Sequence, residues 1–379
     1  MDADMTQQEG EQVLFETRPC RARSMGIITL NNARRFNVLN LPMVRAIQSQ
    51  LDAWAEDDRI ALIVLCGAGE RAFCAGGDVR SVYESLQKAR GRPDNQAEAF
   101  FAAEYRMDYS LATHPKPIVC WGHGVVMGGG LGMMNASRYR LVTADLNMAM
   151  PEIRIGFFPD VGASRFLNRL PGSIGMFLGL TGSSLNLADA LRVGLADFAV
   201  PTDAFEEMLG RLAEQNWQHS DATNDRYLQD ILHAFASQYQ LDLSQSNLEQ
   251  NEQFISRVCR GQDITTVVNE ILAAKPETDW FQQAQENLRT GCPVSAHLIF
   301  EQLHQGLQQS LRDIFMMELV IAVHCTRHRD FQEGVRARLV DKDNNPKWTH
   351  RDVASVPKGW VKAHLTPPWP EDDHPLSDL

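Results

Sequence analysis

Residues 123–162 combine a glycine-rich turn with two acidic residues, and both features could take part in catalysis. The glycines at 128–130 follow an apolar run and precede further apolar residues, which predicts a strand, a tight turn and the start of a helix. Free backbone N–H groups at such a turn can stabilise negative charge, and glycine lets a substrate carbonyl approach closely. Glu152 and Asp160 each follow a proline, which restricts the direction of the backbone. Together these features indicate enolate or oxyanion chemistry.

A second glycine turn lies at residues 76–78, after an earlier apolar run. Residues 60–66 are rich in β-branched side chains, which predicts a strand buried on both faces, and a helix is expected after the turn. Each turn alone could simply pack a helix against a sheet, and Glu152 or Asp160 alone would more often be a surface acid. The combination of two turns with two acids is what favours a functional site.

Other patterns place these turns in a larger order of elements. A hairpin is predicted for residues 13–30 and an amphipathic helix for residues 41–57. Beyond Pro201 the sequence lacks strand-like runs and should be mostly helical. Its clearest feature is an apolar row at every fourth position from Ile299 to Val323, which predicts a helix that buries one stripe.

The chain of 379 residues, with 44% hydrophobic content, is long enough to bury a sizeable core. We expect a core that carries the active site over residues 13–205 and a helical region over residues 206–356 that packs on it. Residues 1–12 and the proline-rich, acidic residues 357–379 are expected to be polar tails.

Composition narrows the classes of partner. The net charge of -12 argues against a nucleic-acid partner, because phosphate binding needs a basic face. Seven cysteines without a C-x-x-C pair fit neither a disulfide framework nor a zinc ribbon, so a reducing compartment is expected. The acidic N-terminus lacks a targeting pattern, and no apolar run approaches the roughly 20 residues of a membrane span. We therefore expect a cytoplasmic protein without a membrane partner.

Three other motifs suggest ligands but fit them poorly. The glycines around position 124 lack G-x-G-x-x-G spacing and lie mid-chain, so a dinucleotide site is not expected. His324 and His328 stand four residues apart without a third ligand nearby, which favours an ordinary helix surface. Residues 341–345 resemble the start of a calcium loop but lack its glycine and final glutamate, which favours a solvated turn. No metal site is expected.

Five segments of the sequence carry a family resemblance. The segments AFCAGGDVR, HGVVMGGGLG and AMPEIRIGFFPDVGASRFL resemble the crotonase (enoyl-CoA hydratase/isomerase) superfamily. Later in the chain, CPVSAHLIFEQL and FQEGVRARLVDKDNNPKW look like the carboxy-terminal signatures of its 3-hydroxyisobutyryl-CoA hydrolase branch. The resemblance implies an α/β fold, the ββα superhelix of crotonases, with an extended helical C-terminal region.

The resemblance also implies roles for individual residues. Gly77 and Gly129 would form an oxyanion hole by donating backbone N–H groups to the thioester oxygen. Glu152 and Asp160 would be the catalytic acids, and both would contact the substrate, as Gly129 would. Glu104 matches an acid that lines the acyl pocket and is expected to bind substrate there.

One departure from the hydratases stands at Gly132, where they carry a second catalytic glutamate. The implied function is therefore hydrolysis of a short 3-hydroxyacyl-CoA thioester, above all 3-hydroxyisobutyryl-CoA in valine breakdown. No cofactor is expected, because coenzyme A is part of the substrate. Glu152 could attack the carbonyl to form a mixed anhydride or could activate water, and the sequence leaves both routes open. The alternatives are an enoyl-CoA hydratase or isomerase and a non-catalytic acyl-CoA-binding scaffold. The resemblance also allows a homo-oligomer.

Overall fold

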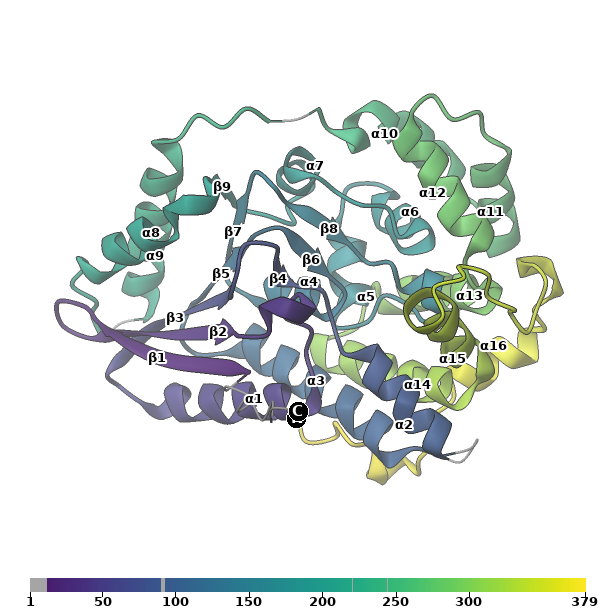
Figure 1. Cartoon of the computed structure of the whole chain (residues 1–379), viewed down its shortest axis with the longest axis horizontal. Helices are drawn as coiled ribbons and strands as arrows, with labels where there is room; N and C mark the ends of the chain where they lie inside the picture. Colours follow the sequence, from purple (N-terminus) through teal and green to yellow (C-terminus); the bar gives the residue numbers. More distant parts are fainter. Residues whose placement is uncertain (1–11, 90–92, 220, 244) are drawn as a thin grey trace, which may run out of the picture.

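The computed structural model describes residues 12–89, 93–219, 221–243 and 245–379, so residues 1–11 of the expected N-terminal tail lie outside the described part. Two β-sheets form the centre, and helices pack around them (Figure 1). The larger sheet has the strand order β1-β2-β3-β5-β7-β9 and the smaller has the order β4-β6-β8. The strands are β1 (Val13–Pro19), β2 (Ser24–Leu30), β3 (Ile60–Gly67), β4 (Ala72–Cys74), β5 (Ile118–Gly122), β6 (Val125–Met127), β7 (Tyr139–Thr143), β8 (Asn147–Ala149) and β9 (Phe198–Val200).

Successive strands alternate between the two sheets, so that β3, β5 and β7 of the larger sheet are followed by β4, β6 and β8 of the smaller one. A helix or a 3₁₀ turn follows each pair, and this repetition is the ββα superhelix that the sequence predicts. The hairpin expected over residues 13–30 is present, because β1 pairs with β2 in antiparallel fashion. In the smaller sheet β6 pairs in parallel with both β4 and β8. Parallel strands end at the same edge, so the segments that leave these strands emerge together.

Strand β3 is buried along almost its whole length, as its apolar sequence predicts. Leu62 and Val64 face a cluster closed by α8 and α9, whereas Ile63 and Leu65 belong to the main hydrophobic core. Alternate side chains of a strand point to opposite faces, so one strand serves two separate cores. Figure 1 shows α8 and α9 on one side of the molecule and α10, α11 and α12 on the other.

The helices fill the rest of the chain, and the amphipathic helix predicted over residues 41–57 is α1. They are α1 (Leu41–Glu56), α2 (Val79–Ala89), α3 (Asn95–Thr113), α4 (Gly129–Ala136), α5 (Ala163–Phe166), α6 (Ile174–Thr181), α7 (Leu187–Arg192), α8 (Phe205–Ala213), α9 (Asp221–Ser237), α10 (Asn247–Val258), α11 (Ile264–Ala273), α12 (Asp279–Thr290), α13 (Pro293–Gly306), α14 (Leu311–Arg327), α15 (Arg329–Val335) and α16 (Lys358–His364). Short 3₁₀ turns are η1 (Ala33–Arg35), η2 (Glu152–Ile155), η3 (Leu167–Arg169), η4 (Thr202–Ala204), η6 (Val353–Ser355) and η7 (Glu371–Asp373), and η5 (Arg336–Val340) is a π-helical turn.

The apolar row from Ile299 to Val323 does not lie on one helix. It is divided between α13 and α14, and Leu307, between them, is 64% exposed. An α-helix has 3.6 residues per turn, so residues four apart are rotated by about 40° relative to each other around the helix axis. After a few turns such residues therefore no longer lie on one face of the helix. Ser310 then begins α14 by accepting a hydrogen bond from the N–H of Asp313.

Residues 357–379 are not a loose surface tail, which corrects that expectation. They begin with α16 and end in a segment whose Leu376 is fully buried. Asp378 pairs with Arg106 at 2.6 Å, and Arg312 donates a hydrogen bond to the carbonyl of Leu379 at 2.9 Å. A few apolar side chains and two arginines are enough to hold this polar segment against α3 and α14. The division into residues 13–205 and 206–356 stays a prediction. Over the ranges described, no helix has the length and apolarity to cross a bilayer.

Candidate active site

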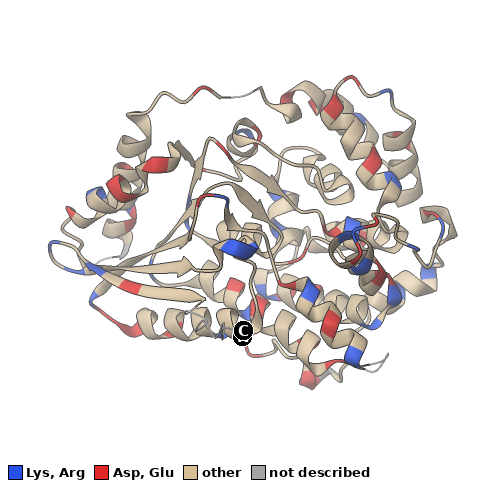
Figure 2. Cartoon of the chain, viewed as in Figure 1, with Lys and Arg blue, Asp and Glu red and all other residues tan. Residues whose placement is uncertain are grey.

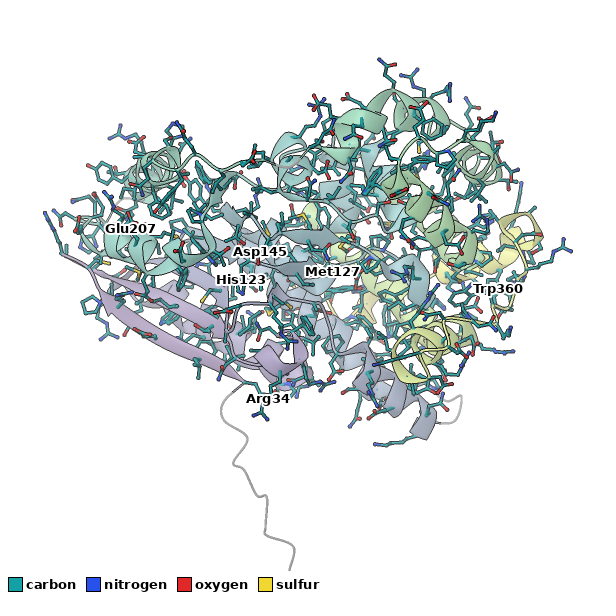
Figure 3. The ribbon with its side chains drawn as sticks, turned by 45° about the horizontal axis from the view of Figure 1, so that its top comes forward. Arg34, His123, Met127, Asp145, Glu207 and Trp360 are labelled. Carbon is teal, nitrogen blue, oxygen red and sulfur yellow. The ribbon has the colours of Figure 1, made fainter. Side chains whose placement is uncertain are left out.

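The two glycine turns meet where β4 and β6 end. The nitrogen of Gly129 lies 3.4 Å from the position that a Cβ of Gly76 would occupy, and the nitrogen of Gly77 lies 3.6 Å from the corresponding position at Gly129. Gly76 and Gly128 have φ values of 100° and 51°, a region that favours glycine. Within the described ranges neither Gly77 N–H nor Gly129 N–H has a hydrogen-bond acceptor. Both amides are therefore free to donate to one substrate oxygen. Met127, labelled in Figure 3, is the last residue of β6 before this turn.

A cavity of about 320 Å³ opens in front of these amides, and three acids line it. Glu104 comes from α3, Glu152 begins η2, and Asp160 lies in the turn that follows. All three are buried, with exposed fractions of 2%, 7% and 5%. Oε1 of Glu152 lies 3.0 Å from the position of a Cβ on Gly128, so this carboxyl group faces the glycine turn. The structure thus brings together all five residues that the sequence predicts for the site.

Burial controls the protonation of these acids. It raises the pKa of Glu152 and of Glu104 well above the ordinary range, and the charge of Asp160 raises both further. Burial also raises the pKa of Asp160, to about 7, although the hydroxyl of Tyr105 donates a hydrogen bond to its Oδ2 at 2.7 Å and favours the ionised form. Oε1 of Glu104 and Oε2 of Glu152 have no hydrogen-bond partner among the described residues. Both oxygens are thus buried acceptors whose hydrogen-bonding capacity is unused.

The turn that carries Asp160 is held by the C-terminal helices. Val161 has a φ of 54°, which a β-branched residue rarely adopts. Glu318 of α14 accepts hydrogen bonds from the N–H groups of Gly162 at 2.7 Å and Ser164 at 2.9 Å. Gln302 of α13 donates to the carbonyl of Pro159 at 2.7 Å. Sequence reasoning missed Glu318 and Gln302, and their only signal is that each is a polar residue beside the apolar row of α13 and α14.

Asp108 is a fourth buried acid near the site that sequence reasoning missed. It lies one turn after Glu104 on α3, is fully buried, and has no partner for either oxygen among the described residues. Burial and then the charge of Glu104 raise its pKa well above the usual range. Two acids four residues apart on an amphipathic helix were the available signal. Asp108 does not line the cavity, so it does not touch a substrate bound there.

The position of Gly132 excludes the second glutamate of a hydratase. A Cβ there would lie 2.5 Å from Cβ of Val161, the residue that follows Asp160. Gly132 also lines a different cavity from the one that holds the acids. A longer side chain at this position would therefore displace the Asp160 turn instead of reaching the substrate.

The metal motifs rejected from sequence have other roles. Nε2 of His324 donates a hydrogen bond to the carbonyl of Thr366 at 2.7 Å, and its ring stacks with that of His328. Asp341 and Asp343 both accept from the guanidinium of Arg336 at 2.7 Å. Among the residues with described positions, no group of three His, Cys, Asp or Glu side chains is arranged to hold a metal ion.

A ββα superhelix that brings two free amides and three buried acids to one cavity is the arrangement of a crotonase-type protein. The chain belongs to the enoyl-CoA hydratase/isomerase family, whose model matches residues 25–365. The predicted family and fold are thus confirmed.

Relatives within this family point to one branch. The mitochondrial 3-hydroxyisobutyryl-CoA hydrolase of Danio rerio is 35% identical over 94% of this chain and 90% of its own length. The 3-hydroxyisobutyryl-CoA hydrolase 1 of Arabidopsis thaliana is 33% identical over 96% of this chain and 93% of its own length. Among solved structures, a carnitinyl-CoA dehydratase from Mycobacterium thermoresistibile has a TM-score of 0.81 and 32% identity, with 94% of this chain and 97% of that chain covered. An enoyl-CoA hydratase from Rhodobacter sphaeroides 2.4.1 has a TM-score of 0.81 and 30% identity, with coverage of 94% and 98%.

Proposed function

We propose that this protein hydrolyses short 3-hydroxyacyl-CoA thioesters, with 3-hydroxyisobutyryl-CoA as the preferred substrate. The observation that carries this proposal is the single cavity in which two free amides, of Gly77 and Gly129, face the buried acids Glu152 and Asp160. The relatives named as 3-hydroxyisobutyryl-CoA hydrolases support the same activity. The acyl group then lies against Glu104, whose carboxyl group packs beside Gly129.

The two amides supply the stabilisation that thioester hydrolysis needs. Attack on the carbonyl carbon places negative charge on its oxygen, and a preorganised N–H donor is worth roughly 10²- to 10³-fold in rate. Water adds its oxygen to the acyl carbon, the carbon–sulfur bond breaks, and the products are a carboxylic acid and free coenzyme A. One proton leaves the attacking water and one reaches the departing sulfur.

The carboxyl pair of Glu152 and Asp160 carries these protons. Burial raises the pKa of both acids, and the charge of Asp160 raises that of Glu152 further, so Glu152 keeps its proton more strongly than Asp160 does. The ionised member accepts the proton of water and the protonated member gives a proton to the thiolate. In the second route, Glu152 attacks the carbonyl itself and forms a mixed anhydride that water then cleaves. Both routes use the same amides and the same pair.

Hydration of an enoyl-CoA is the alternative reaction within the family, and two structures with high similarity are described as a dehydratase and a hydratase. The packing of Gly132 against Val161 disfavours it, because no second glutamate can stand there. A non-catalytic acyl-CoA scaffold is the alternative from another class. Buried acids without partners are costly to keep, which favours turnover over simple binding.

Thiol release from 3-hydroxyisobutyryl-CoA, measured beside hydration of crotonyl-CoA, tests the proposal. We expect hydrolysis to dominate, and we expect Glu152→Gln and Gly129→Ala to lose at least 100-fold in kcat, because one removes a reacting carboxyl group and the other places a methyl group against Glu104. Glu84→Gln, on the exposed pair with Arg80, is the matched control and should keep full activity. Preferred hydration would assign the protein to the hydratases, and tight acyl-CoA binding without product would assign it to the scaffolds.

The proposed activity needs no cofactor beyond the coenzyme A of its substrate, and it fits valine breakdown as its setting. A cytoplasmic location stays a prediction, and several relatives are named as mitochondrial, including those of Danio rerio and Homo sapiens. Acyl-CoA is the proposed partner, and a homo-oligomer also stays a prediction.

A further inference from the structure

Two arginines line the same cavity as the three acids, and neither has an acidic partner. Arg154 lies on η2, two residues after Glu152, and Arg338 lies on the π-helical turn η5. Neither forms a salt bridge among the described residues, and the side chain of Arg154 has no hydrogen bond there, although its backbone N–H donates to Pro151. Nε of both side chains is buried and without a partner. Figure 2 shows basic positions on the chain around α15, which leads directly into η5.

Arg338 is held in place by neutral groups. Its terminal nitrogens donate to Oδ1 of Asn344 at 3.0 Å and to Oγ1 of Thr290 at 3.1 Å. Burial and the charge of Arg154 lower the pKa of Arg338, whereas Glu286 acts in the opposite direction from a distance. Burial alone lowers the pKa of Arg154. Two partly buried cations thus lie near each other, and neither forms an ion pair with any residue that the structure describes. A bound anion would stabilise this arrangement.

The distance from the carbonyl decides which part of a thioester carries that anion. The phosphates of coenzyme A lie roughly 15 Å from the thioester along the extended pantetheine arm. The two arginines line the same cavity, of about 320 Å³, as the amides that would hold the carbonyl oxygen. A group at the end of a short acyl chain lies about 5 Å from the carbonyl and remains inside this cavity.

We propose that Arg154 and Arg338 form a subsite for a carboxylate at the far end of the acyl chain, so that the enzyme also accepts monothioesters of short dicarboxylic acids. This inference rests on the proposed thioesterase function and extends its substrate class. Guanidinium groups bind carboxylates through paired hydrogen bonds. The terminal nitrogens of Arg154 form no hydrogen bond among the described residues and supply donors for such a contact.

Thiol release from glutaryl-CoA and from pentanoyl-CoA tests the subsite, because the two acyl chains have equal length and differ only in the terminal carboxylate. We expect the wild type to favour glutaryl-CoA in kcat/KM by roughly 10- to 100-fold, the value of a charge-assisted paired contact. Arg154→Met and Arg338→Met should reduce this ratio towards one, and Arg154→Lys should keep part of it. The matched control is Arg165→Met, an arginine that lines another cavity, and it should leave the ratio unchanged.

Glutaryl and pentanoyl thioesters of N-acetylcysteamine, which lacks the phosphates of coenzyme A, show which anion the arginines bind. The proposal requires that the wild type still prefer the glutaryl thioester in kcat/KM. It also requires that the arginine variants still lose this preference. An effect of the arginine variants that is equal for both acyl groups on coenzyme A and absent from the truncated thioesters would assign the arginines to the phosphates and overturn the proposal. A wild-type ratio near one would overturn it as well. Calorimetric binding of free glutarate, to the wild type and to Arg154→Lys, reports the subsite even if no thioester is hydrolysed.

Discussion

The carboxylate of Glu318 accepts the backbone N–H of Gly162 at 2.7 Å, which ties α14 to the turn that carries Asp160. The same carboxylate also accepts the N–H of Ser164, so one side chain holds the segment that directly follows Val161, whose φ is 54°. A local backbone of this kind persists only when its surroundings hold it. Helix α14 therefore positions the turn of Asp160, the acid that we propose is catalytic.

Glu318→Ala should loosen this turn. Two buried N–H groups lose their charged acceptor, and we expect a loss of about 2–4 kcal/mol in the free energy of unfolding, together with a fall in kcat. Urea unfolding measures the first and thiol release the second. Glu318→Gln keeps one acceptor oxygen, so its free energy of unfolding should lie between those of the wild type and Glu318→Ala. Glu270→Ala, on the exposed face of α11, is the control. Equal stability of Glu318→Ala and the control would show that the turn keeps its structure without the hydrogen bonds to Glu318.

Tyr105→Phe should move the pH profile of kcat/KM to higher pH. The hydroxyl of Tyr105 donates to Asp160 and lowers the pKa of that acid, which burial raises to about 7. Without the hydrogen bond the ionised form is less stable, so activity that depends on it should appear about one to two pH units later. Tyr109→Phe is the matched control, because its ring also packs against Phe315 and its hydroxyl has no bond to an acid among the described residues. A shift to lower pH in Tyr105→Phe would contradict the assignment.

Asp108→Asn should stabilise the protein, and by more at pH 8 than at pH 6.5. Burial raises the pKa of Asp108, so the folded state keeps a proton that the unfolded state has released above its ordinary pKa. Stability from such a group is lost as pH rises, by at most about 1.4 kcal/mol per pH unit, and the amide removes that loss. Unfolding in urea at both pH values checks the sign. Asp58→Asn, on the exposed end of the loop after α1, should show no such pH dependence.

Gly132→Ala should destabilise the protein, although alanine favours helices. Its Cβ would lie 2.5 Å from Cβ of Val161, so the cost of overpacking, about 1–3 kcal/mol, exceeds the gain in helix propensity. Gly210→Ala on α8 meets no atom within 4 Å and should be neutral or stabilising by about 0.5–1 kcal/mol. Thermal unfolding of the two variants gives the comparison. A stable Gly132→Ala variant would remove the steric argument against a glutamate at this position.

Local patterns in the sequence were sufficient for several parts of the molecule. The hairpin of β1 and β2, the buried strand β3 and the helix α1 all follow from short-range periodicity and turn residues. The row from Ile299 to Val323 was misassigned, because a spacing of four residues fits a helix only over a few turns.

The sequence by itself determined which residues could take part in chemistry. They are Gly77 and Gly129, in two glycine turns whose backbone N–H groups could donate hydrogen bonds, and Glu152 and Asp160, which each follow a proline. These depend on backbone freedom and on neighbours along the chain. Only the tertiary structure decided that they share one cavity, that Glu318 holds the Asp160 turn, and that burial raises the pKa of each acid. Those properties arise from side chains that are distant in sequence and from the exclusion of water, which exist only once the sheets and helices have packed.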